Sequence, residues 1–360
     1  MSRVYNFSAG PSMLPDFVLA RVKEELLEYR DTHQSVMEMS HRSKEYLSII
    51  EACEAKFRSM LGVSDDYTVL FLQGGAYTQF AMLPMNLMTV NRTADYLITG
   101  SWGEKAYLEG KKFGEARIVA SSEDKNFTYI PEIDASRLNP DADFMHFCYN
   151  NTIFGTSFSS TPSSIVPLAA DVSSMILSKP LDVNDYGILY AGAQKNMGIA
   201  GLTVVVIRKD LCDRSPVDIP SMFSYSIQQK NQSMFNTPAT FPIYVLSVML
   251  DWLDEEIGGL AAMQKINKEK SSIIYDYLDE SNMFYGTVEK SSRSDMNICF
   301  ISEDDSINKE FCAAATAAGF LNLAGHRSVG GMRASVYNAM PIEGVKALRD
   351  FMSTFEKEHK

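Results

Sequence analysis

The chain has 360 residues and a mass of 40.2 kDa, a length that predicts about two domains, each with a sizeable core. Hydrophobic residues make up 46% and charged residues 22%, which excludes a disordered or fibrous chain. The 33 basic and 45 acidic residues give a formal net charge of -12. The surface therefore has no general attraction for nucleic acid or an anionic membrane, and an anionic ligand needs a local basic pocket.

We also expect no secretory signal and no membrane-spanning segment. Residues 1–10 lack a charged region followed by an apolar stretch, and no run approaches the ~18 apolar residues of a spanning helix. The five cysteines are scattered without a C-x-x-C pair, and the five histidines are isolated. We therefore predict no disulfide framework, no metal, and a soluble cytoplasmic protein without nucleic-acid or membrane partners.

Helical and extended patterns alternate through the first two thirds of the chain. Apolar residues at helical spacing predict helices over 15–30, 43–61, 77–88 and 104–113. Short apolar runs predict strands over 68–72, 96–99, 117–120, 144–149, 166–170, 187–191 and 202–207. This alternation predicts an α/β fold, with a mostly parallel sheet flanked by helices.

The segment 210–240 interrupts this rhythm with three prolines and many polar residues. Long excursions in compact enzymes usually cover a site or a subunit interface. Helices are predicted over 243–256 and 261–279, followed by strand 297–302, helix 307–318, strand 331–335 and helix 343–356. We therefore expect a large domain over 16–257 and a smaller α+β C-terminal domain over 258–360, joined by the N-terminal segment 1–15.

A glycine pair, Gly74 and Gly75, lies between a predicted strand and a predicted helix. Glycines at this place let backbone N–H groups approach a phosphate at the helix N-terminus, where the dipole also favours an anion. A tight turn without a ligand explains the pair equally well. The pattern is neither G-x-G-x-x-G nor a Walker loop, so it gives little support for a dinucleotide or ATP.

Asp171 follows the strand predicted over 166–170, and Lys195 follows the next strand within Gly-Ala-Gln-Lys-Asn. Taken singly, a helix-capping Asp and a surface Lys are the commoner explanations. Together they would reach the same edge of a parallel sheet, where open α/β sheets bind their ligands. A lysine and a carboxylate are the two groups that pyridoxal phosphate requires, one for the Schiff base and one for the pyridinium nitrogen.

Further side chains follow other strands at this edge. Trp102 lies in the sequence Gly-Ser-Trp-Gly at 100–103 and could stack on a flat cofactor ring, although a core position is the commoner role for a tryptophan. Asn150, Asn151 and Thr152 offer amides and a hydroxyl, or form a polar turn. The agreement of four such features at strand ends favours one ligand site.

Basic residues stand in surroundings rich in Ser, Gly and Met: His41 with Arg42, His326 with Arg327, and Arg333. Arginine in such a setting is a good bidentate clamp for carboxylate or phosphate. A solvated surface charge is the simpler role for any one of them.

With these residues in view, the sequence resembles the phosphoserine aminotransferases, which are fold-type I pyridoxal-phosphate transaminases of class V. The likeness runs essentially end to end. Its motifs occupy residues 6–11, 41–43, 74–75, 150–155, 171–174, 192–196, 326–328 and 331–335. The motifs at 192–196 and 326–328 are the most specific.

The resemblance implies a homodimer that converts O-phospho-L-serine and 2-oxoglutarate to 3-phosphohydroxypyruvate and L-glutamate in serine biosynthesis. The family also often transaminates 3-hydroxy-4-phosphothreonine in vitamin B6 synthesis. By the same resemblance, Lys195 is the Schiff-base lysine and Asp171 the pyridinium partner. The implied cofactor-binding residues are Gly75, Ala76, Tyr77, Trp102, Thr152, Asp171, Gln194, Lys195, Asn236 and Thr237.

Within that set, Asn236 and Thr237 match residues that reach the phosphate from the neighbouring subunit. Arg333 matches the clamp for the substrate α-carboxylate. The implied pocket for the distal group consists of His41, Arg42, His326 and Arg327. The chain departs from the family at Tyr77, where many members carry Arg.

Three alternatives compete with this interpretation. Another fold-type I enzyme, such as an alanine–glyoxylate transaminase or a cysteine desulfurase, would share the fold. A desulfurase needs an exposed cysteine in a mobile loop, whereas Cys299 and Cys312 lie in a predicted strand and helix. The missing glycine fingerprint argues against a nicotinamide-dependent oxidoreductase, and a protein that only stores the cofactor would leave the arginines unexplained.

Overall fold

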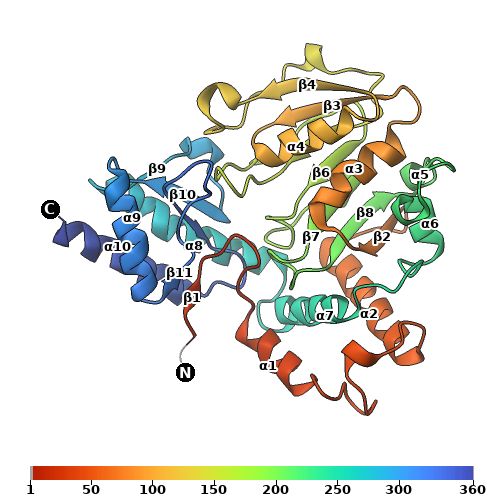
Figure 1. Cartoon of the computed structure of the whole chain (residues 1–360), viewed down its shortest axis with the longest axis horizontal. Coiled ribbons are helices and arrows are strands. Elements are labelled where there is room, and N and C mark those ends of the chain that lie inside the picture. Colours follow the sequence, from red (N-terminus) through yellow and green to blue (C-terminus); the bar gives the residue numbers. More distant parts are fainter. Residues whose placement is uncertain (1–2, 360) are drawn as a thin grey trace.

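A computed structural model describes residues 3–359 of the chain (Figure 1). Its main sheet consists of seven strands: β2 (Tyr67–Leu72), β3 (Thr93–Ile98), β4 (Glu115–Ser121), β5 (Met145–Cys148), β6 (Leu168–Asp171), β7 (Ile188–Gly192) and β8 (Thr203–Arg208). The order across the sheet is β2-β8-β7-β6-β5-β3-β4. Within this sheet β8 is antiparallel to both of its neighbours, β2 and β7, and the other neighbouring pairs are parallel. The predicted α/β fold with a mostly parallel sheet is confirmed.

Helices cover both faces of this sheet. They include α2 (Lys44–Leu61), α3 (Gly75–Leu87), α4 (Ser101–Gly110) and α7 (Thr240–Glu255). Side chains alternate between faces along each strand. Val69 and Phe71 of β2 pack in the core with α2 and α7, whereas Leu70 and Leu72 pack with α3 and α4. Burial on both faces explains why these strands read as continuous apolar runs rather than as alternating patterns.

The C-terminal region, residues 260–358, lies beside the main sheet and is drawn in blue in Figure 1. Its elements are α8 (Leu260–Glu280), β9 (Tyr285–Gly286), β10 (Asn297–Ile301), α9 (Asp305–Ala317), β11 (Phe320–Leu321), β12 (Met332–Ser335) and α10 (Ile342–Glu358). It has a hydrophobic core of its own, which Phe7 and Met13 of the N-terminal segment join. The short strand β1 (Tyr5–Asn6) pairs with β11. The domain boundary at residue 257 stays a prediction.

Two predicted segments differ in detail from the structure. The helix expected over 15–30 is only α1 (Asp16–Glu24), because the chain turns afterwards. Arg30 and His33 adopt positive φ and Leu26 is exposed, whereas Tyr29 packs against Tyr244 from outside the helix, so the apolar periodicity extends beyond the helix itself. The excursion over 210–240 contains the end of α5 (Lys209–Cys212) and α6 (Tyr225–Lys230). Within residues 3–359, no helix is both long and apolar enough to cross a bilayer.

Candidate active site

The carboxyl ends of β2, β3, β5, β6 and β7 meet at one edge of the main sheet, and the antiparallel β8 begins there. A cavity of about 480 Å³ opens at this edge. It is closed by residues from the N-terminal segment and from the C-terminal region. The lining residues are Ala9, Gly10, Gly74, Gly75, Ala76, Tyr77, Trp102, Thr152, Ile153, Asp171, Ser173, Gln194, Lys195, His326 and Arg333. The structure therefore gathers most of the predicted site residues into one cavity.

Lys195 follows β7, and its amine reaches the residue that follows β5. Nζ of Lys195 donates a hydrogen bond to Oγ1 of the buried Thr152 at 2.7 Å. Burial lowers the pKa of Lys195 below its ordinary value, and the nearby Asp171 carboxylate opposes that shift. A lysine with a lowered pKa holds more of its amine in the neutral, nucleophilic form near neutral pH.

Asp171 is the last residue of β6, one position earlier relative to the strand end than the sequence suggests. It is buried, and its Oδ1 accepts a hydrogen bond from the N–H of Ser173 at 2.9 Å. The Ser173 hydroxyl in turn accepts from the N–H of Gly192 at 3.1 Å. This arrangement fixes one carboxylate oxygen and leaves the other for a ligand in the cavity.

The glycine pair forms the start of α3, as the sequence suggests. Gly74 has φ 92°, and a Cβ there would lie 2.0 Å from the Thr78 hydroxyl, so the turn requires glycine. The N–H of Gly75 donates to Thr203 Oγ1 at 2.8 Å. N–H groups in the first turn of a helix have no partner within the helix, so those of Ala76 and Tyr77 suit an anion.

Trp102 is the aromatic wall of the cavity, with Tyr77 packed edge-on at 5.7 Å between ring centroids. Lys105 lies one turn further along α4. Its amine is 4.4 Å from the centroid of the Trp102 ring and donates to the Tyr77 hydroxyl at 2.8 Å. Sequence analysis missed Lys105, although its i+3 spacing from Trp102 could have indicated it.

Arg333 and His326 lie on the opposite wall, which belongs to the C-terminal region, and Arg333 brings positive charge to it. Nη1 of Arg333 donates to the carbonyl of Thr152 at 3.1 Å, and the ring of His326 contacts the Ser328 hydroxyl at 2.7 Å. Partial burial, and then the charge of Arg333, lower the pKa of His326. No carboxylate within residues 3–359 pairs with Lys195, Arg333 or His326.

Two buried nitrogen atoms of the cavity walls also lack a partner. Trp102 Nε1 and Arg333 Nε make no hydrogen bond to any described residue. Buried polar groups are normally satisfied, so such atoms point to a polar ligand. The lysine, the carboxylate, the aromatic wall and the helix N-terminus together fit the chemistry of pyridoxal phosphate.

The remaining predicted residues do not line this cavity. Asn236 and Thr237 lie near the loop after β2, where the Asn236 amide donates to Gln73 Oε1 at 3.2 Å. Arg42, Arg327 and Thr237 are exposed, and His41 is half-buried. A single chain therefore brings the cofactor candidates together but leaves part of the predicted distal-group pocket outside.

The structure also shows cavity residues to which sequence analysis gave no role. Ala9 and Gly10 line it, and a Cβ on Gly10 would lie 3.3 Å from Cγ of Lys195. The motif at 6–11 was the only signal for them. Tyr337, directly behind Thr152, had no signal at all, because its place depends on how the C-terminal region packs.

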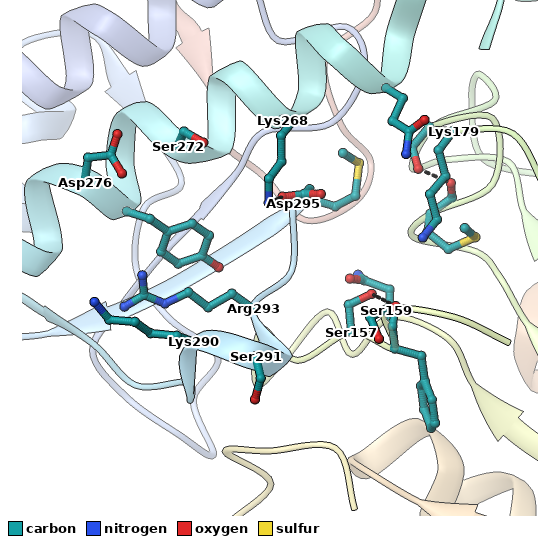
Figure 2. Close-up of a pocket in the computed structure, with 17 residues that line it drawn as sticks. Ser157, Ser159, Lys179, Lys268, Ser272, Asp276, Lys290, Ser291, Arg293 and Asp295 are labelled. Atoms are coloured by element: carbon teal, nitrogen blue, oxygen red, sulfur yellow. Dashed lines mark hydrogen bonds and ion pairs between the residues drawn. The ribbon is translucent and has the colours of Figure 1, made fainter. Parts of the chain in front are cut away.

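A second polar cavity, also of about 480 Å³, lies between α8, the segment 290–296 and residues 157–159 (Figure 2). Lys268 pairs there with Asp295 at 3.3 Å. Lys290 and Arg293 pair with Asp279 at 2.8 and 2.6 Å. Lys179 has no carboxylate partner among the described residues, and its amine instead contacts the Tyr149 hydroxyl at 3.3 Å.

The cysteines are free, and four of the five are buried. Burial raises the pKa of Cys299 to about 12 and also raises that of Cys312 on α9. Such thiols lack the reactive thiolate that a desulfurase needs. Across residues 3–359, no three His, Cys, Asp or Glu side chains are grouped as a metal site would require.

The fold and the cavity together define a class-V aminotransferase, and the sequence profile of the family "Aminotransferase class-V" matches residues 4–348. The chain is 49% identical over 358 residues to the phosphoserine aminotransferase of Geobacillus kaustophilus, which covers 99% of both chains. It is 48% identical to the phosphoserine aminotransferase of Bacillus cereus (strain ATCC 14579), and this alignment covers both chains completely. The phosphoserine aminotransferase structure from Bacillus circulans subsp. alkalophilus superposes with a TM-score of 0.96 at 45% identity, covering 99% of each chain.

A further solved structure, pyridoxal-phosphate-bound phosphoserine aminotransferase from Trichomonas vaginalis, has a TM-score of 0.92 at 37% identity. It covers 98% of this chain and all of its own. This chain belongs to the phosphoserine aminotransferases, within the class-V aminotransferase family.

Proposed function

We propose that the chain transfers the amino group of O-phospho-L-serine to 2-oxoglutarate, giving 3-phosphohydroxypyruvate and L-glutamate, with pyridoxal 5'-phosphate as its cofactor. The observation that carries the proposal is the cavity at the sheet edge. It holds Lys195 and Asp171 beside cations that have no carboxylate partner within residues 3–359. Both substrates are anionic amino or oxo acids, which such a cavity attracts despite the net negative charge of the chain.

The cofactor supplies an electron sink for the α-carbon of the substrate. Lys195 would bind it covalently, and Asp171 would hold a proton on the ring nitrogen through a charge-assisted hydrogen bond. Trp102 would stack on the ring, and Thr152 would hydrogen-bond near its phenolic oxygen. The proposed phosphate-binding groups are the backbone N–H groups of Ala76 and Tyr77 and the side chain of Gln194, with Gly75 in the turn that presents them.

Arg333 is proposed to bind the α-carboxylate of the substrate, since its Nε lacks a partner among the described residues. The amine of Lys195, released from the cofactor when the substrate's amino group replaces it, would then take up the proton of the substrate α-carbon. Its lowered pKa suits this general-base step at neutral pH. His326, Arg327, His41 and Arg42 are proposed to bind the distal phosphate or carboxylate.

We further propose that the active enzyme is a homodimer with shared sites. Asn236 and Thr237 do not line the cavity of their own chain but contact Gln73 in the loop after β2, from where they would complete the cofactor-phosphate site of a second copy. Mixing Lys195→Ala and Asn236→Ala subunits tests this idea, because a heterodimer would contain one intact site. If a verified heterodimer recovers no activity, the shared site is refuted.

We also propose a cytoplasmic location, which the free cysteines support.

The decisive experiment for the function is the absorbance of the purified protein before and after phosphoserine is added. We expect a yellow protein whose absorbance changes with phosphoserine, and glutamate formation when 2-oxoglutarate follows. Alanine with glyoxylate is the control donor–acceptor pair. Faster turnover of that pair than of phosphoserine would identify the alternative transaminase, and a colourless protein without bound cofactor would refute the proposal.

A further inference from the structure

We infer that Lys270 is a positioning residue for Lys195, because it anchors the turn after β12 that holds Asn196, the next residue of the chain after Lys195. Lys270 lies on α8, is 0% exposed and forms no ion pair with a described carboxylate. It does not line the cavity, so it acts on the site only through other residues. The inference rests on the proposed role of Lys195.

Three backbone carbonyls surround the amine of Lys270. Its Nζ donates to the carbonyls of Tyr337 at 2.7 Å, Met340 at 3.2 Å and Asn338 at 3.3 Å. An ammonium group has three hydrogens, one for each acceptor, whereas a neutral amine has two hydrogens and a lone pair. The carbonyls therefore favour the charged form and oppose the effect of burial, which lowers the pKa of Lys270 to about 7. The ammonium group thus fixes the turn 337–340 to α8.

One peptide group connects this anchor to the cofactor lysine. The carbonyl of Tyr337 belongs to the same peptide group as the N–H of Asn338, which donates to Oδ1 of Asn196 at 3.1 Å. Hydrogen bonds at the two ends of one peptide group polarise and strengthen each other. The Asn196 amide nitrogen donates to the carbonyl of Ile176 at 3.2 Å, so both ends of that amide are bound. The side chain of Asn196 therefore fixes the backbone beside Lys195 against the turn.

The side chain of Asn338 binds the same turn to the loop after β6. Its Nδ2 donates to the carbonyl of Leu177 at 2.8 Å. Its Oδ1 accepts at 2.8 Å from the amide of Asn267, which also donates to the carbonyl of Ser178 at 3.1 Å. Asn267 is buried and lies three residues before Lys270 on α8. Two neighbouring residues of this helix therefore hold the turn at the sheet edge where the cavity opens.

A movement of the turn would also reach the cavity through β12. Arg333 lies on this strand, which leads into the turn, and donates to the carbonyl of Thr152 at 3.1 Å. The amine of Lys195 donates to the hydroxyl of the same threonine at 2.7 Å. Without the anchor at Lys270, both the proposed carboxylate clamp and the cofactor lysine would lose part of their support.

The test is the rate at which the cofactor-free, full-length chain captures pyridoxal 5'-phosphate, followed by absorbance at pH 6.5, where Lys270 is charged. Borohydride reduction and peptide mass spectrometry confirm that the captured cofactor is on Lys195. Lys270→Met keeps an unbranched side chain but removes the ammonium group. We expect capture to slow by about 10-fold, the equivalent of one hydrogen bond. An unchanged rate in a folded variant would overturn the inference.

Ser271→Ala is the matched control. Ser271 is the next residue of α8 and is equally buried, but its hydroxyl donates to Asp295 at 2.7 Å instead of to the turn. The variant should capture the cofactor within about twofold of the wild-type rate. A slowing equal to that of Lys270→Met would show that the loss of any buried polar group on α8 has this effect, and the inference would fail.

An Asn196→Ala background tests the route through Asn196. There, Lys270→Met should still lower the urea midpoint of unfolding, because three buried carbonyls lose their donor, but it should not slow capture any further. A merely structural role would lower stability and slow capture in both backgrounds. That result would contradict the route through Asn196.

If Lys270→Met does not fold, Lys270→Gln retains two N–H donors on a side chain one atom shorter. It should slow capture by a smaller factor, and a wild-type rate would again overturn the inference. All of these rates are measured without phosphoserine. Their outcome is therefore distinguishable from a failure of the proposed transamination, which the turnover assay reports.

Discussion

Two cavities lined by residues 3–359 have the same volume, about 480 Å³, but they differ in how their cations are paired. In the cavity of Figure 2, Lys268, Lys290 and Arg293 each pair with a carboxylate. In the cavity at the sheet edge, Lys195 and Arg333 have no carboxylate partner among residues 3–359. The Figure 2 cavity holds more basic residues, and among them Lys179 is the one that pairs with no carboxylate of the described residues.

A cation that forms an ion pair is already neutralised by a neighbouring carboxylate, so an incoming anion must compete with that carboxylate. An unpaired cation in a partly buried site keeps its full attraction for an anion. We therefore expect anion binding at the sheet-edge cavity and structural roles for the ion pairs of the Figure 2 cavity. Variants at the sheet-edge site and variants of the Figure 2 cavity should therefore differ in their effect on activity.

The largest difference is expected for the two lysines without a carboxylate partner, one in each cavity. Lys195→Ala removes the amine that bonds the cofactor, so turnover of phosphoserine should fall on the order of 10⁴-fold or more. Lys179→Ala, in the other cavity, should retain activity within about twofold. Steady-state turnover measures both. Borohydride reduction of the wild type should place the cofactor adduct on Lys195, and an adduct on another lysine would refute the assignment.

The carboxylates provide the next contrast. Asp171→Asn keeps the shape of the side chain but removes the charge beside the cofactor nitrogen, so kcat should fall on the order of 100-fold. Asp171→Glu should retain more activity. Asp295→Asn, in the cavity of Figure 2, loses only a partly exposed ion pair and should keep kcat near wild type. Equal activity of Asp171→Asn and wild type would contradict the electron-sink role.

The arginines test the α-carboxylate clamp. Arg333→Ala should lower kcat/KM by roughly 10- to 100-fold for phosphoserine and glutamate alike, because both carry that carboxylate. Arg293→Ala breaks the two hydrogen bonds to Asp279 instead. It should lower stability and leave kcat/KM nearly unchanged. A loss for only one substrate would show that Arg333 binds the distal group.

A smaller effect is expected for residues that recognise the distal anion. Arg42→Ala and Arg327→Ala should lower kcat/KM for phosphoserine by about 10-fold while sparing alanine, which has no distal anion. Lys290→Ala, from the paired cavity, is the control for a general loss of positive charge. Equal losses with phosphoserine and alanine would mean that these arginines are structural and that the phosphate pocket lies elsewhere.

The sequence predicted the cavity residues at the strand ends better than the contacts that the N-terminal segment and the C-terminal region make around the cavity, and the reason is physical. Asp171, Lys195 and Thr152 follow strands that run parallel, so chain order alone brings them to one edge. Ala9 and Tyr337 meet across 328 positions in the sequence, and only the packing of the C-terminal region onto the sheet brings them together. No local pattern encodes such a contact.

The dependence on tertiary packing also explains why the sequence predicted too late an end for α1 and could not predict which cations remain unpaired. Apolar periodicity continues beyond Glu24 through Leu26 and Tyr29, but the chain turns there, and Tyr29 packs against Tyr244 from a segment that is not helical. Nor does sequence show which cations find a carboxylate. Arg293 and Asp279 pair across 14 positions, whereas Arg333 faces the cavity with its Nε unsatisfied by any described residue.

The smallest expected effect concerns the stability that the paired cavity contributes. Hydrogen bonds from Arg293 lower the pKa of Asp279 from its ordinary 3.8 to about 2. A depressed carboxyl pKa stabilises the fold above the ordinary value, and the contribution is lost as pH falls toward 2. Asp279→Asn should therefore cost about 1 kcal/mol of unfolding free energy at neutral pH, and the difference from wild type should shrink below pH 4. Urea unfolding between pH 7 and pH 3 measures this difference.

Asp276→Asn is the control. It removes a carboxylate of the same cavity, but that carboxylate makes no ion pair with any described residue, so the difference from wild type should not change with pH. A difference for Asp279→Asn that stays constant down to pH 3, or an equal convergence for Asp276→Asn, would show that the ion pairs do not stabilise this cavity. The contrast with the sheet edge would then rest on the unpaired cations alone.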